Sequence, residues 1–304
     1  MAAIDVPAAM SNNRLPLAIA SIALLSVACA AGGAASPGGS AGPSAAPSSA
    51  GGVDHPTGPT DVVLRLEEGG GFVPIEFMAG SAPIFTLYGD GRVVFQQRTD
   101  VFPEPDAAGI VRSNPWRTAQ LDAEQIEELL TFALGPGGLG AARDNYGNDM
   151  VADASTSTFT INAGGVDKKV AIYALGMEGE GVADVVARRA FQTLADRLRD
   201  FDDGGSISTD VYAPAGYRAV LVEREDTPPN AIAWPWPDLT LDDFKADING
   251  EGSQQFPHRA MTPDEIAALD LGDVSGGMQG AALKGPDGKT YSFILRPLLP
   301  DETE

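Results

Sequence analysis

Residues 83–95 read PIFTLYGDGRVVF, which is two β-rich runs separated by an Asp-Gly turn. An Asp-Gly pair between two such runs is a strong signal for an antiparallel hairpin. Apolar residues recur at every second position on both sides of the turn, so they should share one face of the hairpin: Phe85, Leu87, Val93 and Phe95. This stretch therefore predicts antiparallel sheet with an apolar face that other elements must cover.

The same pattern returns along the chain. Runs at 156–162 and 170–175 flank Gly164-Gly165, and runs at 281–283 and 291–295 flank a turn at 285–288. Single strand candidates lie at 61–66 and 217–223.

Helices are predicted between these hairpins. One covers 122–134, where Asp122 and Gln125 can form a capping box, and another covers 181–201. The stripe expected on the second helix is Val182, Val185, Val186, Ala190, Leu194 and Leu198. A third helix should begin at Thr262. Hairpins separated by helices indicate an α+β fold, with mainly antiparallel sheet and two to four helices packed on it.

The folded region is long enough for one large domain or two small ones. An acidic run at 200–203 followed by Gly204-Gly205 marks a boundary. We therefore expect an α+β domain over 61–205, and a smaller α+β domain, or an extension of the first, over 206–304.

Residues 15–28 form an uncharged apolar run of about 14 residues, too short to span a membrane as a helix, which needs about 20. The length suits the apolar region of a secretory signal, and Arg14 supplies the preceding positive charge. Met1 and Met10 are both candidate translation starts, and Met10 places Arg14 in the more usual position.

Residues 25–29, LSVAC, resemble the lipobox of bacterial lipoproteins, although Ser26 stands where that motif usually has leucine. Cys29 is the single cysteine of the chain. The resemblance implies that residues 1–28 are a signal peptide and that Cys29 carries the lipid, palmitate included, that holds an extracytoplasmic protein on the cell membrane. Two or more acyl chains anchor stably.

Residues 29–60 are expected to form the lipidated cysteine and a tether of Ala, Gly, Ser and Pro. Such a composition buries too little apolar surface to order, and a coil of this length spans roughly 30 Å. The net charge of −22 argues against binding to nucleic acid, which needs a cationic patch. It also keeps the domain away from anionic headgroups.

Several segments together are similar to a family of exported, uncharacterised proteins from actinobacteria and related high-GC bacteria. They are FTLYGDGRV at 85–93, TSTFT at 156–160, VAIYALG at 170–176, WPWP at 234–237 and LRPLLP at 295–300. The similarity spans most of 61–302. The family has no activity to transfer to individual residues.

The sequence contains little that matches known catalytic or metal-binding motifs. His258 is the single histidine beyond the tether, and no Gly-x-Ser-x-Gly elbow accompanies it. Zinc sites of the Cys/His type are excluded by count. GPDGKT at 285–290 is read as a hairpin turn rather than a phosphate loop. An irregular calcium site between Asp144 and Asp153 stays open, with a solvated loop as the default.

The sequence predicts no catalytic, cofactor-binding or metal-binding residue, and favours a non-enzymatic binding module with an envelope protein or glycan as partner. Trp234 and Trp236 are the predicted recognition surface, because exposed aromatic residues concentrate binding energy. One alternative is a carbohydrate-active hydrolase with paired carboxylates, its cleft lined by tryptophans such as Trp116. Another is an inhibitor of an extracellular enzyme with a protruding loop near Pro228-Pro229.

Overall fold

The stretch at 83–95 forms the predicted hairpin. In the computed structural model, which describes residues 52–99, 101, 103–202, 205–245 and 256–302, β2 (Phe85–Tyr88) pairs antiparallel with β3 (Arg92–Phe95). Phe85 lies opposite Phe95 and Leu87 opposite Val93, and all four side chains are buried in one core.

This hairpin sits inside an eight-stranded sheet with the order β6-β8-β7-β1-β2-β3-β5-β9. Every pairing in it is antiparallel except the short parallel pair of β6 and β8. Its other strands are β1 (Val62–Gly69), β5 (Arg117–Gln120), β6 (Asn145–Tyr146), β7 (Thr156–Ala163), β8 (Val166–Tyr173) and β9 (Asp210–Val211).

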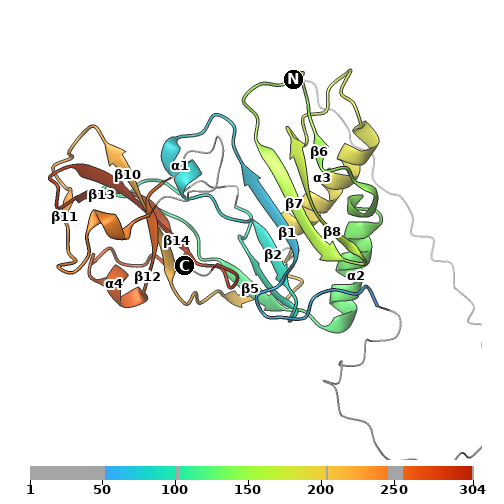
Figure 1. Cartoon of the computed structure of the whole chain (residues 1–304), viewed down its shortest axis with the longest axis horizontal. Coiled ribbons are helices and arrows are strands. Elements are labelled where there is room, and N and C mark those ends of the chain that lie inside the picture. Colours follow the sequence, from blue (N-terminus) through green and yellow to red (C-terminus); the bar gives the residue numbers. More distant parts are fainter. Residues whose placement is uncertain (1–51, 100, 102, 203–204, 246–255, 303–304) are drawn as a thin grey trace, which may run out of the picture. The chain divides into compact units, whose positions relative to one another are not determined.

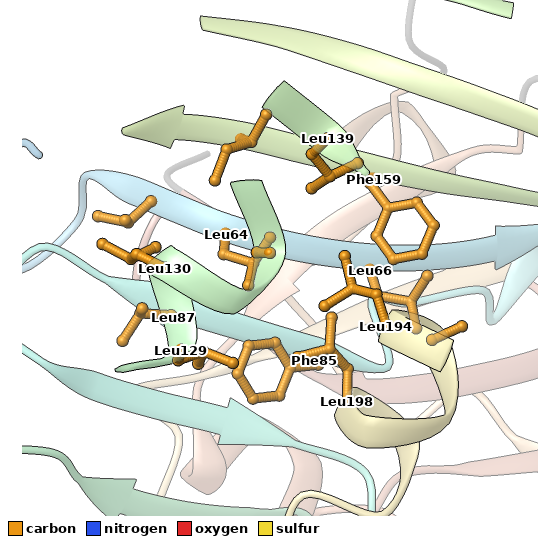
Figure 2. Close-up of a cluster of buried hydrophobic side chains, with 14 of the residues drawn as sticks. Leu64, Leu66, Phe85, Leu87, Leu129, Leu130, Leu139, Phe159, Leu194 and Leu198 are labelled. Carbon is orange, nitrogen blue, oxygen red and sulfur yellow. The ribbon is translucent and has the colours of Figure 1, made fainter. Parts of the chain in front are cut away.

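Helices α2 (Ala123–Leu134) and α3 (Val185–Arg199) cover one face of this sheet (Figure 1). The predicted capping box of α2 is present, with Asp122 accepting from the Gln125 backbone and Gln125 accepting in return. Figure 2 shows the core between helices and sheet, where leucines of α2 and α3 meet Phe85 and Phe159.

The stripe predicted on α3 is partly wrong. Val186 is 84% exposed, whereas the side chains of Phe191 and Ala195, which were not expected, are fully buried beside Leu194 and Leu198. The helix begins at Val185 rather than Gly181, and its buried row also contains the arginine Arg188.

The second sheet has six strands: five follow the order β11-β13-β14-β10-β12, and β4 pairs with β13. All its pairs are antiparallel except that of β11 and β13. The strands are β4 (Val111–Arg112), β10 (Tyr217–Arg224), β11 (Ile232–Ala233), β12 (His258–Met261), β13 (Met278–Lys284) and β14 (Thr290–Pro297).

Short helical segments complete the described part of the chain. Helix α1 (Ile75–Ala79) packs on β10 and β14, and α4 (Pro263–Ala267) begins with the predicted capping box of Thr262 and Glu265. Two 3-10 turns are η1 (Leu139–Ala141) and η2 (Leu241–Asp243). Fourteen strands and four α-helices among the described residues confirm the predicted α+β fold with dominant antiparallel sheet.

The segment at 298–302 joins the two sheets. It leaves β14 and lies against the face of the first sheet that the helices do not cover, where Leu299 packs with Tyr88. The Asp301 carboxylate accepts two hydrogen bonds from Arg65, at 2.7 and 2.8 Å, and one from the Tyr88 hydroxyl at 2.6 Å. Burial and the hydrogen bond to Asp301 raise the pKa of the Tyr88 hydroxyl well above its ordinary value.

The predicted tether ends earlier than expected. Residues 52–60 were assigned to it, but Val53 packs on the first core and the Asp54 carbonyl accepts from the Gly164 amide at 2.7 Å. Val53 is the first large apolar residue after the signal region, and it packs on the first core near Gly164 of the β7–β8 turn. Residues 29–51, Cys29 included, lie outside the described residues.

Candidate functional site

The structure places Trp234 and Trp236 in the core of the second sheet. Trp236 is 6% exposed and its indole N–H donates to the Glu265 carbonyl at 2.7 Å, while the half-buried Trp234 donates to the Leu239 carbonyl at 2.9 Å. The two rings meet edge to face, and Trp236 also packs on Phe293. This burial contradicts the predicted exposed recognition surface, because the two indoles are used to fill a core.

Exposed apolar side chains gather elsewhere. Among the described residues eight large hydrophobic side chains are exposed, and six of them lie on three connections of the first sheet or on the helices that these connections lead into. They are Phe72, Val73, Phe77, Met150, Met177 and Val186, with Phe72 the most exposed at 93%. We call the segments 70–74, 147–155 and 174–184 the loop rim.

The strand register brings these three segments to one end of the sheet. Gly69, the last residue of β1, lies opposite Thr156, the first residue of β7, and Thr156 lies opposite Tyr173, the last residue of β8. The segments that follow β1, precede β7 and follow β8 therefore emerge side by side (Figure 1).

Hydrogen bonds hold the loops of the rim to one another. The Phe72 amide donates to the Asp153 carbonyl at 3.2 Å, and the buried Asn148 side chain donates to the Met177 carbonyl at 3.2 Å. Gly71 has a φ of +81°, and a Cβ on it would stand 3.1 Å from the Asp153 carbonyl oxygen. The first loop thus approaches the second as closely as a glycine permits.

Arg188 lies beneath the rim and is fully buried. Its guanidinium donates to the carbonyls of Gly147 at 3.1 Å and Tyr173 at 2.6 Å, and it lies 3.6 Å from the Glu178 carboxylate. A buried cation needs such partners, because burial without them is costly. One side chain of α3 thereby connects two of the three loops to the rigid part of the fold.

The rim and its borders carry charge of one sign. Segments 70–80, 147–155 and 174–186 contain six carboxylates and no Lys, Arg or His: Glu76, Asp149, Asp153, Glu178, Glu180 and Asp184. Arg188 pairs with Glu178, and Arg143 pairs with Asp184. Asp149, Asp153 and Glu180 are exposed and form no ion pair within the described part of the chain.

The other sequence candidates occupy ordinary structural positions. His258 is a buried residue of β12 whose Nδ1 lies 3.0 Å from the Phe256 carbonyl oxygen. The stretch at 285–290 forms the β13–β14 turn, as predicted, and the Gly285 amide donates to the Lys289 carbonyl. In the segment from Asp144 to Asp153, Asn148 is turned inward toward the third loop.

The least exposed carboxylates already have partners. Asp202 accepts from the Gln97 amide at 2.8 Å, Glu178 pairs with Arg188, Asp301 with Arg65, and Glu302 with Arg296. Among the described residues, no group of three or more His, Cys, Asp and Glu is arranged to hold a metal ion. Within the part of the chain that the structure describes, the geometry therefore singles out no pair of carboxylates for acid and base chemistry.

Sequence reasoning missed the loop rim because its apolar residues follow no period. The available signal was a large apolar residue in a loop of glycine and acidic residues, as in GGGFV at 69–73, NDM at 148–150 and GME at 176–178. No described helix is both long and apolar enough to cross a membrane. No protein-family model matches the chain, and searches of curated proteins and of solved structures also gave no match.

Proposed function

We propose that the chain is a lipid-anchored, extracytoplasmic binding module whose partner surface is the loop rim. The observation that carries the proposal is the concentration of exposed apolar side chains on three hydrogen-bonded loops. Large exposed apolar patches on soluble domains mark interaction sites, and loops fixed on a rigid scaffold are where such sites are built. A resemblance to exported actinobacterial-type lipoproteins agrees with this placement.

The direction in which the chain enters the fold supports presentation of the rim. Val53 and Asp54 pack at the β7–β8 turn, and this turn is at the opposite end of β7 from the rim. The eight residues of β7 span about 25 Å. The described part of the chain therefore begins at the end of the domain that is far from the rim, and the proposed anchor at Cys29 precedes it in the sequence.

The anchor is tested by radiolabelled palmitate in cells that express the full chain or its Cys29→Ala variant. We expect label and membrane association in the first and neither in the second. Equal membrane association of the two chains, or no label in either, would remove the lipoprotein part of the proposal.

The partner surface is tested by a photo-cross-linking amino acid in intact cells. A probe at Met150 should capture a specific partner, whereas a probe at Asp167, exposed on β8 near the opposite end of the sheet, should not. The same partner captured equally from both positions, or none from Met150, would refute binding at the rim.

A further inference from the structure

We infer that the loop rim takes a basic, apolar polypeptide segment rather than a lipid surface or a second copy of this chain. The inference rests on the proposed function and names the chemistry of its partner. It follows from the arrangement of charge around the exposed apolar side chains.

Carboxylates without an ion-pair partner lie in the second and third loops, and the first loop is hydrogen-bonded to the backbone of one of these acidic residues. Asp149 precedes Met150 in the chain, Asp153 holds the Phe72 amide through its backbone, and Glu180 follows Met177 by three residues. A partner that seats apolar side chains here must bring its neighbouring residues close to these carboxylates. Lysine and arginine are the residues that gain from that approach, and acidic residues are repelled.

The same charges argue against two other occupants, and composition argues against a third. An anionic bilayer surface would face the unpaired carboxylates of Asp149, Asp153 and Glu180, and a self-complementary contact between two copies would bring these carboxylates together. The chain's own residues 30–51 contain only Ala, Gly, Ser and Pro, so they offer no large apolar side chain to fill the rim.

The apolar residues themselves suit a polypeptide. Met150 and Met177 are 70% and 53% exposed, and methionine adapts to side chains of varied shape. Phe72 adds a ring at the tip of the first loop. Aromatic and methionine contacts at the centre with charged pairs around them are the usual anatomy of a protein interface.

The test uses the full chain purified in detergent and two fluorescent amphipathic peptides, one of leucine and lysine and a matched one of leucine and glutamate. Fluorescence anisotropy should show binding of the lysine peptide and none of the glutamate peptide. Affinity should fall at least tenfold between 50 and 500 mM salt, because the carboxylates are exposed to solvent and salt screens their attraction for the lysines.

Two triple variants with the same change in net charge test whether the lysine peptide binds at the loop rim. Asp149→Asn, Asp153→Asn and Glu180→Gln together should weaken binding at least tenfold. The matched control, Asp167→Asn, Glu225→Gln and Asp238→Asn, neutralises three exposed carboxylates outside the rim and should change it less than twofold. Equal losses in the two variants, or no binding of the lysine peptide at micromolar concentration, would overturn the inference.

Hydrogen exchange of the full chain in vesicles tests whether a lipid surface occupies the loop rim instead. Hydrogen exchange at 70–74 and 147–155 should be the same in phosphatidylcholine and in phosphatidylglycerol vesicles. Protection of these loops by phosphatidylglycerol would make the bilayer the occupant. A partner captured at Met150 in cells through a segment without basic residues would overturn this inference while the proposed function stands, whereas capture of no partner removes both.

Discussion

Two regions of this molecule carry conspicuous apolar residues and use them in opposite ways. The segment at 234–237 turns both of its tryptophans toward the second sheet, whereas the loop rim leaves Phe72, Met150 and Met177 in solvent. The difference lies in the surroundings rather than in the residue types. The tryptophans have apolar neighbours and a carbonyl for each indole N–H, while the rim residues stand on tight loops with polar neighbours. An aromatic residue in a sequence therefore marks apolar area, and only the fold decides whether that area is a core or a surface.

The largest effect expected from this comparison is on the buried tryptophan. Trp236→Ala should lower the free energy of unfolding by about 4 kcal/mol, because a fully packed indole is lost and the cavity collapses only in part. Urea denaturation of the full chain measures it, with Trp236→Phe as the milder replacement. A loss below about 1 kcal/mol would place Trp236 outside the core.

The second largest loss of stability is expected when Arg188, which holds two loops of the rim, is replaced. Arg188→Met should cost about 3 kcal/mol, because Glu178 and two carbonyls are left in a buried site without their cation. Hydrogen exchange should quicken in 147–155 and 174–184. Arg189→Met, at the exposed neighbouring position, is the control, and equal stability of the two variants would refute the role of Arg188.

A smaller effect should appear where the second sheet joins the first. Burial alone would raise the pKa of Glu302, but hydrogen bonds and attraction from Arg296 hold that pKa below its ordinary value. A carboxylate with a lowered pKa adds stability that is full above about pH 4.5 and is lost as the pH falls through the folded value.

Glu302→Gln should therefore cost about 1.5 kcal/mol at neutral pH, and the difference from the unchanged chain should shrink below pH 4.5. Thermal unfolding across pH measures it. Thermal unfolding of the Glu180→Gln variant across the same pH range is the control, because it shows how the loss of one exposed carboxylate changes stability. A difference that grows in acid would reverse the sign argued for Glu302.

The smallest effect on stability belongs to the rim itself. Phe72→Ser should change the free energy of unfolding by less than about 0.5 kcal/mol, because the ring is 93% exposed. The same variant should reduce cross-linking to the partner. A loss of stability comparable to that of Trp236→Ala would mean that Phe72 belongs to a core rather than to a surface.

The fold was more accessible to sequence reasoning than the site. The hairpin at 83–95 and the capping box of Asp122 and Gln125 are local features, so composition and spacing sufficed to predict them. The rim depends on register between strands far apart in sequence, with Gly69 opposite Thr156. No local pattern encodes that pairing.

Two corrections have the same origin. The composition of the predicted tether continues to Thr60, yet the Val53 amide donates to the carboxylate of Glu127, 74 residues further along the chain. Trp234 and Trp236 are predicted as a recognition surface because exposed aromatic residues concentrate binding energy, yet both lie against the second sheet. Each error came from judging a segment without the distant residues that cover it.

Because β4 and β9 are exchanged between the two sheets, the chain cannot be divided at residue 205 without disrupting both sheets. Strand β4 precedes the boundary predicted at residue 205 and pairs in the second sheet, and β9 follows that boundary and pairs with β5 in the first. A truncation or gene fusion made at residue 205 would leave each fragment with a stray strand and an uncovered edge. Engineering that carries the loop rim to another scaffold should therefore transfer both halves, or cut only after providing a replacement for each exchanged strand.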